Sequence, residues 1–150
     1  MLARTLYASA LLLLMSACSS GQDELDTVEI TITTSQGPRA LVVEHADEGP
    51  EHEAGLMGRR TIGRHDGMLF TSPTEGVPSF WMKNTLIPLD MIFIQSDGTI
   101  ASIAANRQPG DLTEVSPDEP VRAVLELEGG RSGEMGLEAG DIVAWTPRVP

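Results

Sequence analysis

Glycine and proline recur so often in this chain that an architecture of long helices is excluded. All 15 Gly and all 10 Pro lie after residue 20, where they make up about one residue in five. Average proteins have about one in eight, and both residue types end helices and divide strands into short pieces. A length of 150 residues leaves room for one domain. We therefore expect a single domain of short strands rather than a helical bundle.

Apolar and polar residues alternate with a period of two in several short segments. Residues 28–34 and 40–44 are separated by a turn and predict a β-hairpin. Residues 121–127 alternate as well, although Val124 falls on the otherwise polar face. Further strands are expected at 68–70, 79–83, 89–94, 100–104 and 141–146, and short helices at 50–58 and within 129–140. The expected class is all-β, mainly a β-sandwich or a partly open barrel with one or two short helices.

The first 17 residues have the pattern of a secretory signal peptide. Arg4 is basic, and the apolar run at 8–15 is too short to span a membrane. Two small residues then precede Cys18, the only cysteine of the chain. This order resembles the lipobox of bacterial lipoproteins, and an ordinary signal peptide followed by a coincidental cysteine is the alternative.

The lipobox resemblance implies cleavage before Cys18 and lipid attachment to its sulfur. Several acyl chains on one residue anchor a protein stably, whereas a single chain is marginal. Residues 18–25 are then expected to form the lipidated cysteine and a polar tether, and 26–150 a single domain. The protein would be exported and face the periplasm, and Ser19 slightly favours the outer membrane by resemblance to lipoprotein sorting.

The chain is strongly acidic, with a formal net charge of −12. A surface that binds nucleic acid needs clustered Lys and Arg to neutralise phosphates. We therefore expect no nucleic-acid partner. The expected partners are the membrane, through Cys18, and a small-molecule or envelope ligand, and the sequence does not define an oligomeric state.

No group of residues has the spacing of a metal, cofactor or catalytic motif. His45, His52 and His65 are 7 and 13 residues apart, unlike a zinc-binding helix or hairpin pair. Methionines lie singly in apolar segments, where they usually fill gaps in a core. The nucleophile elbow, the phosphate-binding loop and the nucleotide fingerprint are also missing. The sequence thus predicts no metal, no cofactor and no identifiable catalytic residue.

Residues 80–91 (FWMKNTLIPLDM) hold the strongest candidates for a ligand site. Within it, Trp81 lies beside Lys83, the only lysine of the chain, and Asp90 interrupts an apolar strand. A lone ammonium beside an aromatic ring and a carboxylate is typical of a tuned functional group, and equally of a structural ion pair. The candidate ligand-binding residues are Trp81, Lys83, Asn84, Thr85, Asp90, Arg59 and Asp66.

Lys83 and Asp90 flank the turn at 84–88, so their strands are expected to be antiparallel neighbours. An unpaired carboxylate in an apolar strand is costly, and Lys83 is the expected partner, with Asn84 and Thr85 as alternatives. An extended 80–83 would place Trp81 and Lys83 on the face opposite Phe80 and Met82.

Arg59 begins a basic patch at 59–64 in an otherwise acidic chain. The patch is expected to pair with Asp66 or with the acidic residues of 44–53. Binding of an anionic ligand is the alternative.

Ordered motifs across the chain resemble domain-of-unknown-function family 192. They are GLMGR at 55–59, DGMLF at 66–70, FWMKNTLIPLDMIFI at 80–94, VRAVLEL at 121–127 and the glycine-containing segment 136–141. The resemblance spans about residues 26–146. It implies a compact, mainly β, sandwich-like domain that is often exported and has no established activity, and it supplies no catalytic residue.

Two functions are compatible with these features. The first is a lipid-anchored, non-enzymatic binding or accessory module, in which one carboxylate pairs with Lys83. The second is an envelope-polymer hydrolase or lyase, in which Asp66 or Asp90 acts as acid or base and Lys83 stabilises negative charge. An enzyme further predicts at least two titratable groups converging on an open cleft.

We expect Cys18→Ala to abolish membrane anchoring, because the substitution removes the only thiol that can be acylated. The variant should move from the detergent phase to the aqueous phase in a phase-partitioning experiment, with its domain still folded by circular dichroism. Detergent partitioning equal to that of the wild type would refute the anchor.

Overall fold

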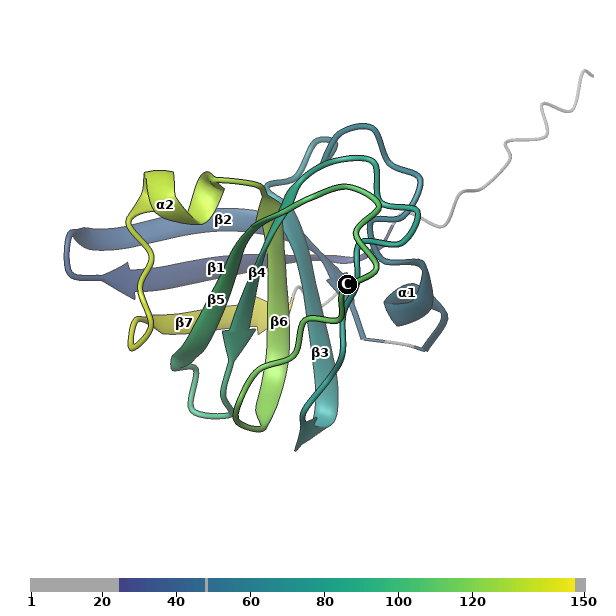
Figure 1. Cartoon of the computed structure of the whole chain (residues 1–150). Coiled ribbons are helices and arrows are strands. Elements are labelled where there is room, and N and C mark those ends of the chain that lie inside the picture. The colour runs from purple at the N-terminus through teal and green to yellow at the C-terminus, as the bar shows by residue number, and fades with distance from the viewer. Residues whose placement is uncertain (1–24, 48, 148–150) are drawn as a thin grey trace, which may run out of the picture.

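A computed structural model of the protein, which describes residues 25–47 and 49–147, shows one seven-stranded mixed sheet and two short helices (Figure 1). The strands are β1 (Thr27–Thr34), β2 (Gly37–Ala46), β3 (Gly67–Gly76), β4 (Leu89–Ile94), β5 (Ile100–Arg107), β6 (Val121–Glu128) and β7 (Ile142–Pro147), and the helices are α1 (Gly49–Ala54) and α2 (Arg131–Met135). The predicted all-β class is confirmed. The predicted signal peptide and Cys18 lie outside the described residues.

Strand order across the sheet is β5-β4-β6-β3-β2-β1-β7. The predicted hairpin is the antiparallel β1–β2 pair, and β3 returns parallel to β2 after α1. At one corner the two edges of the sheet approach each other, where Thr99 bridges Ile142. Gly98 turns the chain there with φ of 88°, and a Cβ at this position would lie 2.5 Å from the carbonyl oxygen of Val143. The sheet therefore bends back on itself but stays open.

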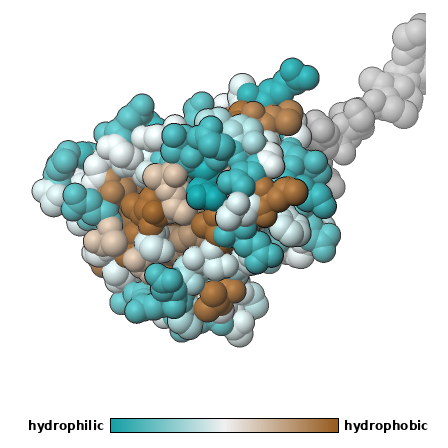
Figure 2. Space-filling model, in the orientation of Figure 1, coloured by the Kyte–Doolittle hydropathy of each residue, from teal (hydrophilic) through white to brown (hydrophobic). Residues whose placement is uncertain are grey.

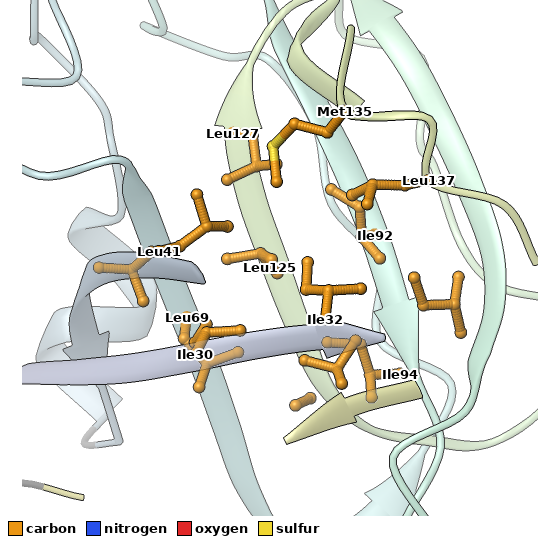
Figure 3. Close-up of a cluster of buried hydrophobic side chains, with 14 of the residues drawn as sticks. Ile30, Ile32, Leu41, Leu69, Ile92, Ile94, Leu125, Leu127, Met135 and Leu137 are labelled. Carbon is orange, nitrogen blue, oxygen red and sulfur yellow. The ribbon is translucent and has the colours of Figure 1, made fainter. Parts of the chain in front are cut away.

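One buried cluster fills the inside of this bend (Figure 3). Strands β1, β2 and β7 run across the direction of β3, β4, β5 and β6 (Figure 1). Buried side chains of the two sets of strands belong to this one cluster. The members labelled in Figure 3 are Ile30, Ile32, Leu41, Leu69, Ile92, Ile94, Leu125, Leu127, Met135 and Leu137. Full burial of one such side chain contributes about 1.5–3 kcal/mol, so this cluster is a major source of stability.

A second buried cluster lies on the opposite face of the central strands. All six residues of β4 are buried, so this strand is covered on both sides. Met91 and Phe93 of β4, Met68 and Phe70 of β3 and Val124 of β6 form the centre of the second cluster. Its cover comes from segments outside the sheet, among them Leu56, Met82 and Ile87. A sheet face covered by irregular chain in this way leaves room for cavities.

The predicted strand at 79–83 is not a strand. Phe80 makes only an isolated bridge with Val115, and the amide of Met82 donates to the carbonyl of Asp111. The neighbour of the 79–83 segment is the proline-containing loop before β6, which offers too few hydrogen-bonding positions for a β-ladder. The expected alternation of side chains is nevertheless present, since Met82 is fully buried and Trp81 is 51% exposed.

Asp90 is not paired with Lys83, Asn84 or Thr85, and that expectation was wrong. Its fully buried carboxylate accepts hydrogen bonds from the amides of Asn106 (2.7 Å), Gly130 (2.9 Å) and Ser132 (2.8 Å), and from the Ser132 hydroxyl (2.6 Å). The β4–β6 register places Asp90 opposite Leu127, close to the start of α2. Asp90 therefore joins β4 to the end of β5 and to the β6–α2 connection.

Burial on its own would raise the pKa of Asp90, but the hydrogen bonds from Ser132, Asn106 and Gly130 outweigh it and lower the pKa below its ordinary value. These donors satisfy the ionised form, which is the form the fold uses.

Neither helix of the described chain is long and apolar enough to cross a bilayer. On the face drawn in Figure 2, hydrophobic residues appear as patches among hydrophilic ones.

Asp90→Asn is expected to lower the free energy of unfolding by about 3 kcal/mol, because the new amide points N–H groups at backbone donors. Asp118→Asn, at an exposed position, is the matched control and should change stability by less than about 0.5 kcal/mol. Urea denaturation measures both. Because the pKa of Asp90 is lower in the folded protein than in the unfolded chain, the ionised carboxylate stabilises the fold at a pH above the unfolded pKa. The stability advantage of the wild type over Asp90→Asn should therefore be full at pH 7 and shrink below about pH 4. An Asp90→Asn protein as stable as the control would contradict this role.

Candidate functional site

An open cavity of about 470 Å³ lies on the second face of the sheet. Residues 52–57, from α1 and the turn after it, form one side, and residues 79–85 form another. The amide of Gly58 donates to the carbonyl of Asn84 over 2.9 Å, which joins the two sides. A volume of this size is within the range of small-molecule sites.

Glu126 of β6 lines this cavity. Its neighbours across the sheet are Met68 of β3 and Met91 of β4, both fully buried. Strand β3 approaches so closely here that a Cβ at Gly67 would lie 2.1 Å from the carbonyl oxygen of Glu126, so only glycine is accommodated. The carboxyl of Glu126 is thus set between two thioether side chains.

The Glu126 carboxyl has no hydrogen bond or ion pair with any described residue, although the residue is only 4% exposed. Burial raises its pKa to about 8. At neutral pH the carboxyl is therefore mostly protonated, because no described residue donates a hydrogen bond to it or forms an ion pair with it. It differs in this respect from Asp90, whose charge is fully hydrogen-bonded.

Aromatic rings form a continuous wall beside Glu126. Phe70 meets His52 edge to face at 5.7 Å and Phe80 at 5.6 Å, and Phe80 meets Phe93 at 6.3 Å. The Nε2 atom of His52 is 3.0 Å from the carbonyl oxygen of Ala46, which fixes the imidazole ring. A smaller cavity of about 130 Å³ shares His52, Phe70 and Phe80 with the first.

Four of the predicted ligand-binding residues lie together along the cavity: Trp81, Lys83, Asn84 and Thr85. The ammonium of the exposed Lys83 lies 5.5 Å from the centre of the Trp81 ring, a cation–π contact. Asn84 has a left-handed backbone with φ of 56°, which turns the chain after Lys83. The hydroxyl of the buried Thr85 donates to the carbonyl of Lys83.

The other three predicted residues, Asp90, Arg59 and Asp66, do not line the cavity. Both Nη atoms of Arg59 bond the two carboxylate oxygens of Glu44 at 2.7 Å, which confirms the predicted pairing with the acidic segment. This hydrogen-bonded pair raises the pKa of Arg59. The carboxylate of Asp66 accepts from the amide of Val42 at 2.9 Å. These groups stabilise the fold and do not converge as a catalytic set.

Glu126 was not among the predicted site residues, because the alternation in 121–127 indicates that the polar positions of this strand face solvent. Only the chain that folds over the second face buries this side of β6. Val124 was the available signal, since an apolar residue on an otherwise polar face indicates that the face is covered. Glu53 and His52 also line the cavity and were not predicted there.

Glu126→Gln is expected to be more stable than the wild type at neutral pH, and increasingly so with rising pH. The folded protein keeps the Glu126 proton while the unfolded chain loses it near the ordinary value of 4.5, so wild-type stability falls between about pH 4.5 and 8, by up to about 1.4 kcal/mol per unit. Urea denaturation from pH 4 to 8 gives the difference. Glu128→Gln, on the same strand but exposed, should run parallel to the wild type. A Glu126→Gln curve that also runs parallel would exclude the raised pKa.

The family model DUF192, described as an uncharacterized ACR, matches residues 30–145. A solved structure of a protein of unknown function from Novosphingobium aromaticivorans DSM 12444 is 38% identical, with a TM-score of 0.79, and the match covers 83% of this chain and 89% of that one. A protein from Sinorhizobium meliloti 1021, for which a role as a transcription regulator has been suggested, is 37% identical, with a TM-score of 0.79 and coverage of 83% and 98%. A search among curated proteins finds no match. The resemblance noted from the ordered motifs is confirmed, and the chain belongs to the DUF192 family.

Proposed function

We propose that this protein is a lipid-anchored ligand-binding protein of the bacterial envelope and that the Glu126 cavity is its binding site. The observation that carries the proposal is the Glu126 carboxyl, which is buried, faces a cavity and has no partner among the described residues. Such a group is costly to bury and adds nothing to the fold. A ligand that reaches it through the cavity would supply the missing partner.

The remaining lining groups support binding rather than core packing. Trp81 exposes half of its surface beside the cavity, and Met57 is 38% exposed. Lys83, Asn84 and Glu53 add polar groups from both sides of the opening. An apolar wall with a few polar groups is the usual composition of a small-molecule site.

Anchoring rests on the lipobox at Cys18. Leu25, seven residues later, packs against the second buried cluster. Seven residues span at most about 25 Å, so lipidation of Cys18 would hold the domain close to the membrane surface. Under the proposal, ligands therefore come from the periplasm or from the membrane surface itself.

We do not extend to this chain the suggested regulatory role of the Sinorhizobium meliloti protein. The formal net charge of −12 on the present chain opposes binding to a phosphate backbone. Direct contact with nucleic acid is therefore not part of the proposal.

Acid catalysis is the second candidate function. Glu126 stays protonated near neutral pH, and Glu53 and His52 line the same cavity. A neutral carboxylic acid in an apolar site is suited to protonating a leaving group. The hydrolase or lyase would then use Glu126 rather than Asp66 or Asp90. Cleavage of an isolated envelope polymer by the wild type but not by Glu126→Gln would favour this function.

Binding in the cavity is tested by nuclear magnetic resonance of the full-length chain with a small-molecule library. We expect amide shifts to cluster at residues 52–57, 79–85 and 126 for the molecules that bind. Ala54→Trp, at an exposed lining position, should block the cavity and remove these shifts.

Ala105→Trp is the matched control, because Ala105 is also exposed and does not line the cavity. It should leave the shifts unchanged. Shifts scattered over the whole surface, or shifts that persist in Ala54→Trp, would reject the cavity as the binding site.

A further inference from the structure

The chemistry around Glu126 also indicates which kind of ligand the cavity takes, an inference that rests on the function proposed above. The carboxyl is flanked by the thioether side chains of Met68 and Met91, which offer at most weak hydrogen bonding. A neutral ligand could satisfy one hydrogen bond there. A positive ion would instead stabilise the carboxylate itself, with a much stronger interaction at low dielectric.

The titratable side chains that line the cavity around Glu126 are His52 and Glu53 from α1, and Lys83 from 79–85. From β3 and β4 the neighbours are the two methionines, which carry no charge. The His52 ring is held by a backbone carbonyl. Lys83 is exposed and lies against Trp81, and no ion pair joins it to Glu126 among the described residues.

An anionic ligand group next to Glu126 would place like charges together in an apolar site. A cation has the opposite effect, and the acidic chain as a whole attracts cations. The rings of Phe70, Phe80 and Trp81 supply surfaces that favour a cation bearing alkyl groups. Charge and wall composition thus favour the same ligand chemistry.

We propose that the cavity binds an organic ammonium ion, whose positive charge lies beside the Glu126 carboxylate while its alkyl groups pack against Phe70, Phe80 and Trp81. Binding ionises Glu126, and its proton passes to solvent. One proton is therefore released for each ammonium ion bound to the protonated form. No covalent bond forms or breaks in the ligand.

Choline and its uncharged isostere 3,3-dimethyl-1-butanol are the probes, since neither titrates between pH 6 and 9. Isothermal titration calorimetry of the full-length protein should show choline affinity rising about tenfold from pH 6 to 7 and levelling off above about pH 8, because the proton on Glu126 competes with the cation. Buffers of different ionisation enthalpy should report release of nearly one proton per choline at pH 6. The isostere should bind more weakly at pH 8 and show neither effect.

Glu126→Gln should lower choline affinity at pH 8 at least tenfold and flatten its pH dependence, while Glu128→Gln should behave as the wild type. Any pH dependence that comes from His52 persists in Glu126→Gln and can be subtracted. Equal affinity for choline and the isostere, a flat wild-type profile, or undiminished binding by Glu126→Gln would each overturn the proposal. Binding of neutral library molecules in the cavity without choline binding would overturn this inference alone and leave the proposed function in place.

Discussion

Strand β4, most of β6 and the first four residues of β3 (67–70) are buried on both faces, and this constraint determines the rest of the structure. The bend of the sheet covers one face with β1, β2 and β7, whose buried side chains form one cluster with those of the central strands. Among the described residues, no second sheet or long helix covers the other face. It is covered by α1 and by irregular chain at 79–88, which leaves the 470 Å³ cavity above β6. The candidate site is therefore a direct result of how the second face is covered.

Two buried carboxyls on adjacent strands show opposite uses of the same chemical group. Asp90 receives four hydrogen bonds and a lowered pKa, and in its ionised form it joins three segments of the fold. Glu126 receives no hydrogen bond from the described chain and has a pKa raised to about 8. The contribution of Asp90 to the stability of the fold explains why its carboxyl is buried. No such contribution explains the burial of Glu126, and an uncompensated buried acid beside an open cavity is the strongest indication of a functional group in this molecule.

Local signals in the sequence located the seven observed strands, the β1–β2 hairpin and the two short helices, because alternation and turn residues act over a few positions. The same signals also predicted a strand at 79–83 that does not form. Contacts between distant segments were not accessible in this way. The partners of Asp90 come from 16 to 42 residues away and are mostly backbone amides, which no side-chain pattern announces. The cover over Glu126 likewise comes from two separate segments. Trp81 and Lys83 could be identified because rare residue types drew attention to them, whereas a glutamate in an alternating strand looks like any exposed one.

Glu126 holds a proton at neutral pH because its buried carboxyl has no partner among the described residues. A ¹³C nuclear magnetic resonance titration of the glutamate side-chain carboxyl carbons measures this directly, with the Glu126 signal assigned by its loss in Glu126→Gln. We expect a midpoint near pH 8 for this carboxyl. A midpoint near the ordinary value of 4.5 would show that the carboxylate is already compensated, and would contradict a protonated Glu126 at neutral pH.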